Sequence, residues 1–219
     1  MKTLDYFVPF VYFFKTKDWL KKFIIASLLT YTLIGATPIL GWTIEIVRRV
    51  GHGEEPVVPE LSDWKTFWRL GGRFAFLNIL WLLPVLLADI LLYLPLIFAR
   101  SIKPGSLLAV FGGTLGCVLV FLLVYSVIYI FLLPSMLILL AGTGSAWEAL
   151  NPVKLWKVVR PHFIEHLIVF FIVGVGLLNL VFLLSPFTLF LLLPPMLVYT
   201  GLVSAHYAGQ LAGLALSDI

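Results

Sequence analysis

Apolar and polar stretches alternate along the chain on a scale that is typical of membrane-crossing helices. Five apolar runs, at residues 23–47, 74–99, 106–142, 162–184 and 186–216, are separated by short polar connections. A helix needs about 20 residues to cross a hydrocarbon core of about 30 Å, so each run is long enough for one span. The pattern therefore predicts an all-α fold, a polytopic integral membrane helical bundle of about five spans, with four and six as the bounds.

Three shorter stretches have the character of membrane-surface segments. Residues 1–18 are aromatic and interrupted by Pro9, and we expect them to lie in the membrane interface. Residues 61–69 and 145–160 place apolar residues at helical spacing with Lys and Arg on the other side, which predicts short amphipathic helices that lead into the spans. The runs and connections leave no stretch for a soluble core, so we expect residues 1–219 to form a single transmembrane domain.

The first apolar run, residues 23–47, allows two interpretations. As one straight helix it would be about 37 Å long. As a hairpin that turns at residues 35–41, with Pro38 at its apex, it would bring nearly all Lys and Arg residues to one side of the membrane, as short cytoplasmic loops prefer. A straight helix divides these residues almost evenly, but it needs no turn at membrane depth, and we prefer it.

Composition places the chain in the membrane. Hydrophobic residues make up 61% of the sequence and charged residues 12%, whereas a soluble domain has about 45–50% and about 25%. The Lys and Arg residues flank the apolar runs, where lipid headgroups lie, so the basic charge indicates membrane lipids and not nucleic acid as partners. The single cysteine, Cys117, cannot form an internal disulfide.

Motifs of enzymatic chemistry are missing from the sequence. It has no phosphate-binding loop, dinucleotide fingerprint, metal-protease pair or nucleophile elbow. We therefore expect no enzymatic activity, and we predict neither catalytic residues nor a metal site. Lipid is the only bound molecule that the composition favours.

Ionisable residues inside apolar runs are costly and each needs an explanation. Asp89 is either a carboxylate that handles protons or cations in a cavity, or a buried acid paired with a base or amide of another span. We prefer the second interpretation, because a carrier would show more than one charge at the membrane midplane and paired broken helices.

The histidines allow a similar choice. His162 and His166 lie one turn apart, with Glu165 between them, and His206 and Gln210 share one helix face in the last run. Imidazole groups could bind a metal or a tetrapyrrole pigment. They could equally form hydrogen bonds between helices. We prefer the hydrogen bonds, because the spacing matches no ligand motif.

Glu45 precedes Arg48 by three residues and Arg49 by four, which brings the side chains together on one helix face. We expect Glu45 to pair with one of these arginines, or with Arg69 of the amphipathic segment. Such a pair would hold the polar connection against the first span.

Several short motifs in order carry a resemblance to a known family. They are GWTIEIVRRV, a glycine-rich gap, PELSDW, an entry into a span that contains WLLP, AWEALNPVKLWKVVR and VSAHYAGQL. Together they resemble the family catalogued as domain of unknown function 4013, prokaryotic multi-pass membrane proteins. The sequence departs from the family at Trp42, where tyrosine is usual, and at Ala212 and Gly213, where a bulkier, basic residue is usual. The resemblance implies a location in the prokaryotic cytoplasmic membrane and no particular activity.

These observations lead to a hypothesis of function and two alternatives. The hypothesis is a non-enzymatic structural or accessory membrane protein that packs in a larger complex or against copies of itself through the small residues Gly112, Gly113 and Gly116. One alternative is a carrier of small molecules, lipids or ions that uses Asp89 and the seam of His206 and Gln210. Another is a pigment-binding membrane subunit.

Overall fold

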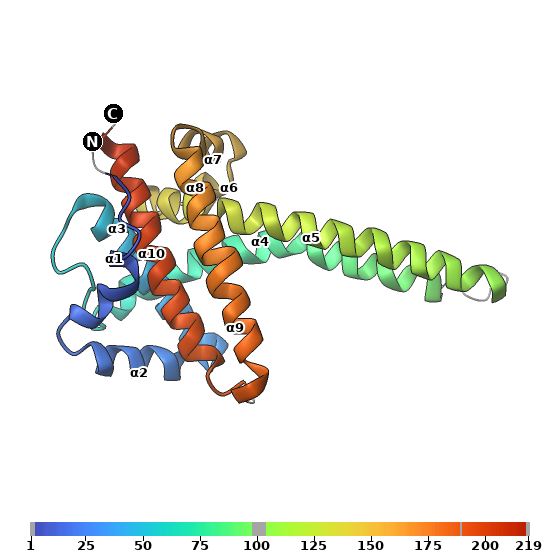
Figure 1. Ribbon diagram of the computed structural model, residues 1–219, viewed down its shortest axis with the longest axis horizontal. Helices are drawn as coiled ribbons and strands as arrows, with labels where there is room; N and C mark the ends of the chain where they lie inside the picture. Colours follow the sequence, from blue (N-terminus) through green and yellow to red (C-terminus); the bar gives the residue numbers. More distant parts are fainter. Residues whose placement is uncertain (1–2, 98–103, 189, 218–219) are drawn as a thin grey trace. The chain divides into compact units, whose positions relative to one another are not determined.

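The computed structural model describes residues 3–97, 104–188 and 190–217, and within these ranges every regular element is a helix (Figure 1). The chain forms two compact units. The first comprises Met1–Leu77 and Phe131–Ile219, and the second comprises Asn78–Ile130. The expectation of a single transmembrane domain stays a prediction.

The first apolar run is divided between two helices, α2 (Trp19–Thr30) and α3 (Leu33–His52). The helix is interrupted at Thr32, whose backbone is extended. The Thr32 side chain caps the start of α3 by accepting a hydrogen bond from the N–H of Gly35. The prediction of one straight helix is therefore wrong. The hairpin interpretation also misplaced the break, since Pro38 lies inside α3.

The core of the first unit lies between α3 and α10 (Leu193–Ser217), which run alongside each other. Trp42, Ile44 and Ile46 of α3 are fully buried. Gly209 of α10 allows the helices to approach closely, because a Cβ atom at this position would lie 2.4 Å from the Cβ atom of Val50. Small residues at helix contacts have this role in membrane proteins.

A second close contact joins α3 to the beginning of α4 (Trp64–Ile97). A Cβ atom on Gly41 would lie 1.9 Å from the carbonyl oxygen of Phe67, and one on Gly71 would lie 1.8 Å from that of Thr37. Residues 61–69 do not form a separate surface helix, contrary to the prediction. The helix continues through Gly71, because the contact with α3 compensates for the low helix propensity of glycine.

The connection at residues 145–160 forms two short helices, α6 (Ala146–Leu150) and α7 (Pro152–Val159). The Asn151 side chain begins α7 by accepting the N–H groups of Val153 and Lys154, as its position before proline predicts. Ser145 makes no such bond at the start of α6. Helix α7 buries Leu155 and exposes its basic side, so it is amphipathic.

A longer helical stretch follows α7. It comprises η3 (Arg160–His162), α8 (Phe163–Val169), the π-helical segment η4 (Phe170–Leu177), α9 (Leu178–Leu184) and η5 (Pro186–Thr188). At the other end of the chain, α1 (Val8–Val11) and η1 (Phe13–Lys15) precede α2.

The second unit pairs residues 78–97 of α4 with the first part of α5 (Pro104–Thr143). Trp81 contacts the rings of Tyr125 and Tyr129, and Tyr125 donates a hydrogen bond to the carbonyl oxygen of Trp81 at 2.6 Å. Ala88 and Val118 are buried in the helix contact. Most other described side chains of this unit are exposed, which makes its surface almost entirely apolar.

Three helical stretches among the described residues are long and apolar enough to cross a membrane. They are Trp64–Tyr93, Leu108–Thr143 and Pro152–Thr188. The chain is therefore compatible with a membrane protein, but the count of five spans is not confirmed. Helix α2 has 12 residues and is too short at about 18 Å, while α3 and α10 carry polar residues such as Glu45 and His206.

Candidate functional site

The C-terminal half of α3 carries a network of charged side chains. Arg48 binds Glu45 through two hydrogen bonds of 2.7 and 2.9 Å, and it binds Glu54 through two of 2.8 and 3.0 Å. Arg49 donates to Glu45 at 3.1 Å and to the carbonyl oxygen of Pro56 at 2.9 Å. The structure thus contains the pairs with Arg48 and Arg49 that the spacing predicts, and these pairs hold the loop after α3 against the helix.

The network sets the protonation of Glu45, which lies outside the three apolar stretches and is almost fully buried. Burial raises the pKa of Glu45, but the hydrogen bonds from Arg48 and Arg49 outweigh it, so the pKa lies below its usual value. Glu45 is therefore ionised at neutral pH.

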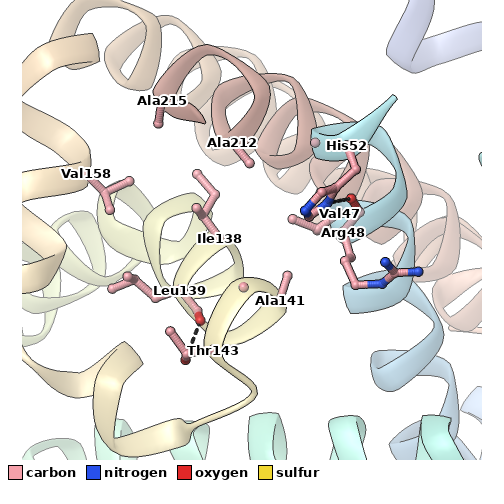
Figure 2. A pocket seen from close by; sticks show the side chains of 12 residues that line it. Val47, Arg48, His52, Ile138, Leu139, Ala141, Thr143, Val158, Ala212 and Ala215 are labelled. Atoms are coloured by element: carbon pink, nitrogen blue, oxygen red, sulfur yellow. Dashed lines mark hydrogen bonds between the residues drawn. The ribbon is translucent and has the colours of Figure 1, made fainter. Parts of the chain in front are cut away.

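A cavity of about 630 Å³ lies beside this network, between α3, the end of α5, α7 and α10 (Figure 2). Ile138, Val158, Ala212 and Ala215 face it with apolar side chains. This volume falls within the range of about 300–1,000 Å³ that is usual for ligand pockets. The cavity is the candidate binding site of the first unit.

The polar residues at this cavity already have hydrogen-bond partners within the chain. The Arg48 guanidinium is held by two carboxylates, the His52 Nδ1 atom lies 2.8 Å from the carbonyl oxygen of Arg48, and the Thr143 hydroxyl donates to the carbonyl oxygen of Leu139 at 2.7 Å. The cavity therefore suits an apolar ligand. The sequence pattern did not predict the cavity, because its walls come from four separate helices.

The predicted seam of His206 and Gln210 contacts the N-terminal segment of the same chain. The Asp5 backbone N–H donates to Gln210 Oε1 at 2.9 Å, and Gln210 Nε2 lies 3.2 Å from His206 Nδ1. The centroids of the Tyr12 and His206 rings are 4.3 Å apart. The polar residues of α10 thus join parts of the chain that are about 200 residues apart.

Two tyrosines of α10 extend this contact. Tyr199 donates to the carbonyl oxygen of Phe10 at 3.1 Å, and Tyr207 donates to that of Tyr6 at 2.7 Å. Residues 4–14 therefore pack against α10 in addition to any contact with the membrane interface. The role of Asp5 was not predicted from the sequence. Its side chain accepts hydrogen bonds from the N–H groups of Val8 and Phe7. These bonds hold the pKa of Asp5 below its usual value.

The other predicted histidines join α8 to α5. His166 is fully buried, its Nδ1 atom lies 2.9 Å from the carbonyl oxygen of His162, and its Nε2 atom lies 2.8 Å from the Ser135 hydroxyl. Glu165 is half-buried in the first turn of α8, where a negative charge is favourable. Among the residues that the structure describes, no group of three or more His, Cys, Asp or Glu could hold a metal ion.

Asp89 differs from these residues because it is exposed, on α4 in the second unit. Within the described ranges it forms no ion pair. Asp89 is therefore not buried among the described residues, and its expected pairing with a base or amide of another span stays a prediction. Gly112, Gly113 and Gly116 have open space where a side chain would lie.

The helical fold, the apolar stretches and the apolar cavity define an all-helical protein compatible with the membrane. A family model described as "Protein of unknown function (DUF4013)" matches residues 24–193, and the chain belongs to this family. The match confirms the resemblance that the sequence motifs indicated. Neither the comparison with curated proteins nor that with solved structures gave a match.

Proposed function

We propose that the protein is a non-enzymatic accessory protein of the prokaryotic cytoplasmic membrane that binds another transmembrane helix through its second unit. The observation that carries this proposal is Asp89, an exposed acid within residues 79–97 of α4, which are otherwise apolar. The apolar stretches support a membrane location. The family resemblance supports the prokaryotic membrane, and the missing catalytic motifs favour a protein without enzymatic activity.

The length of the second unit supports a position across the bilayer. Residues 78–97 of α4 extend for about 30 Å, which matches the thickness of a hydrocarbon core. Asp89 lies near the middle of this stretch. A charged side chain there costs about 2.5–3.5 kcal/mol unless it is paired, so a partner helix with a basic or amide side chain would be stabilising.

The surface around Asp89 has the composition of a helix contact. Leu86 and Tyr93 share its helix face and are more than half exposed. On α5, Gly112, Gly113 and Gly116 leave room for a close approach. The carrier alternative receives less support, because His206 and Gln210 already contact the N-terminal segment and belong to a different unit from Asp89.

The test uses a photoreactive amino acid in the full chain in native membranes. With the probe at Leu86, on the Asp89 face, we expect a crosslink to a discrete membrane protein or to a second copy, which mass spectrometry would distinguish. Leu91, half exposed on another face of α4, is the matched control and should give none.

Replacing Asp89 tests whether the acid carries the contact. Asp89→Ala should lower the Leu86 crosslink about fivefold, because one polar contact between membrane helices contributes roughly 1 kcal/mol. Asp89→Asn should retain part of it through hydrogen bonding. Equal crosslinks from Leu86 and Leu91, or a crosslink unchanged by Asp89→Ala, would contradict the proposal.

A further inference from the structure

We propose that the cavity between α3, α5, α7 and α10 binds an acyl chain of an anionic membrane phospholipid, with the headgroup at the basic side of α7. The cavity measures about 630 Å³, and its apolar walls come from Val47, Ile138, Val158 and Ala212 among others. This site lies in the first unit and is separate from the helix contact proposed for Asp89.

The chemistry of the walls selects a hydrocarbon ligand. Arg48, His52 and Thr143 are the polar side chains at the cavity, and each has its partner within the chain. Figure 2 shows the Arg48 guanidinium turned away from Ile138 and Val158. A ligand would find no unpaired charge to bind, and an apolar cavity does not hold water well.

The small residues in the wall of the cavity suit a narrow ligand. Gly51, Ala141 and Gly142 lie along the wall, and an unbranched hydrocarbon chain can pass beside them.

Helix α7 supplies the argument for an anionic headgroup. Val158 of α7 lines the cavity, while Lys157 beside it and Arg160, the first residue of η3, are exposed. Neither base forms an ion pair among the described residues, whereas Lys154 pairs with Glu148. Trp156 is also exposed. Exposed bases and tryptophan on an amphipathic helix are typical of a segment that contacts anionic lipid headgroups.

The experiment reconstitutes the full chain in phosphatidylcholine vesicles with a trace of phospholipid whose acyl chain carries a photoreactive diazirine. The probe is either phosphatidylglycerol or phosphatidylcholine. After irradiation, peptide mapping should place the label from phosphatidylglycerol on residues 138–143 and 212–215. Excess unlabelled phosphatidylglycerol should displace it, and this competition on the unmodified protein needs no variant to fold.

Two sets of variants test the two parts of the site. Filling the cavity with Ala141→Phe and Ala215→Phe should abolish the labelling, while Ala109→Phe, an exposed alanine in the second unit, should leave it unchanged. Lys157→Gln with Arg160→Gln should lower labelling by phosphatidylglycerol about tenfold or more, because each base near a membrane surface contributes about a fivefold effect.

Three results would overturn the proposal. The first is labelling of residues 138–143 and 212–215 that unlabelled lipid does not displace. The second is labelling that persists when a folded variant has its cavity filled. The third is equal labelling by the two lipids, which would exclude the anionic headgroup.

Discussion

The two units contain the same kinds of residue in opposite situations. In the first unit, Gly41 and Gly209 lie where helices touch, and the acid Glu45 is bonded to two arginines. In the second unit, Gly113 has open space beside it and Asp89 is exposed. The comparison indicates that contacts within the chain stabilise the first unit, whereas the second unit exposes an apolar surface, to which we have proposed that a partner helix binds.

The largest expected effect concerns the glycines. Gly41→Ala should lower the free energy of unfolding in detergent by about 3 kcal/mol or prevent folding, because its Cβ atom would collide with the backbone at Phe67. Gly113→Ala has no such neighbour and should raise stability by up to about 1 kcal/mol, because alanine has a higher helix propensity than glycine. Equal effects of the two substitutions would remove the distinction between the units.

The two acids should differ next. Glu45→Gln weakens charged hydrogen bonds in a nearly buried position and should cost about 1.5–3 kcal/mol, with faster proteolysis of the loop at residues 51–59. Asp89→Asn should change the stability of the detergent-solubilised chain little. Unchanged proteolysis of the loop in Glu45→Gln would show that the network does not hold it.

The ion pairs of Glu45 also make the free energy of unfolding depend on pH. Because the folded protein holds the pKa of Glu45 below its usual value, the ionised acid contributes stability that is fully present above about pH 4.3, the ordinary pKa. This contribution is lost as the pH falls through the pKa of the folded state. The difference in unfolding free energy between the unmodified protein and Glu45→Gln should therefore shrink in acid, and a difference that grows would contradict the assignment.

Two serines give the third comparison. Ser135→Ala should cost about 1–3 kcal/mol, because it leaves the buried Nε2 atom of His166 without its partner. Ser126 is exposed and bonds the carbonyl oxygen of Leu122 in its own helix, so Ser126→Ala is the control. Thermal unfolding of both variants in one detergent measures the difference, and equal midpoints would argue against a stabilising bond between α5 and α8.

The features that could be predicted from the sequence are local ones. Asn151 begins a helix and Glu45 meets Arg48 because the residues involved are neighbours on one helical turn. The break at Thr32 was missed because no glycine or proline marks it, while Gly35, Pro38 and Gly41 nearby suggested a different place. Gly41 in fact serves the contact with Gly71.

The candidate sites depend on contacts that no local pattern encodes. The cavity requires four helices to meet, and the contact of Asp5 with Gln210 joins the two ends of the chain. The spacing on α10 did show that His206 and Gln210 share a face. The spacing could not show which segment covers these two residues, because the N-terminal segment that does so lies about 200 residues away in the sequence.

The smallest expected effect tests that covering segment. Tyr207 is buried and donates to the carbonyl oxygen of Tyr6, so Tyr207→Phe should lower the free energy of unfolding by about 0.5–1.5 kcal/mol. Tyr93, which is more than half exposed in the second unit, gives the matched control Tyr93→Phe. Hydrogen exchange at residues 5–13 should quicken in the first variant and not in the second, because the lost bond ties the N-terminal segment to α10. If exchange there stays slow in Tyr207→Phe, the remaining contacts of Tyr12 with α10 are sufficient to hold the segment, and Tyr207 is a packing residue only.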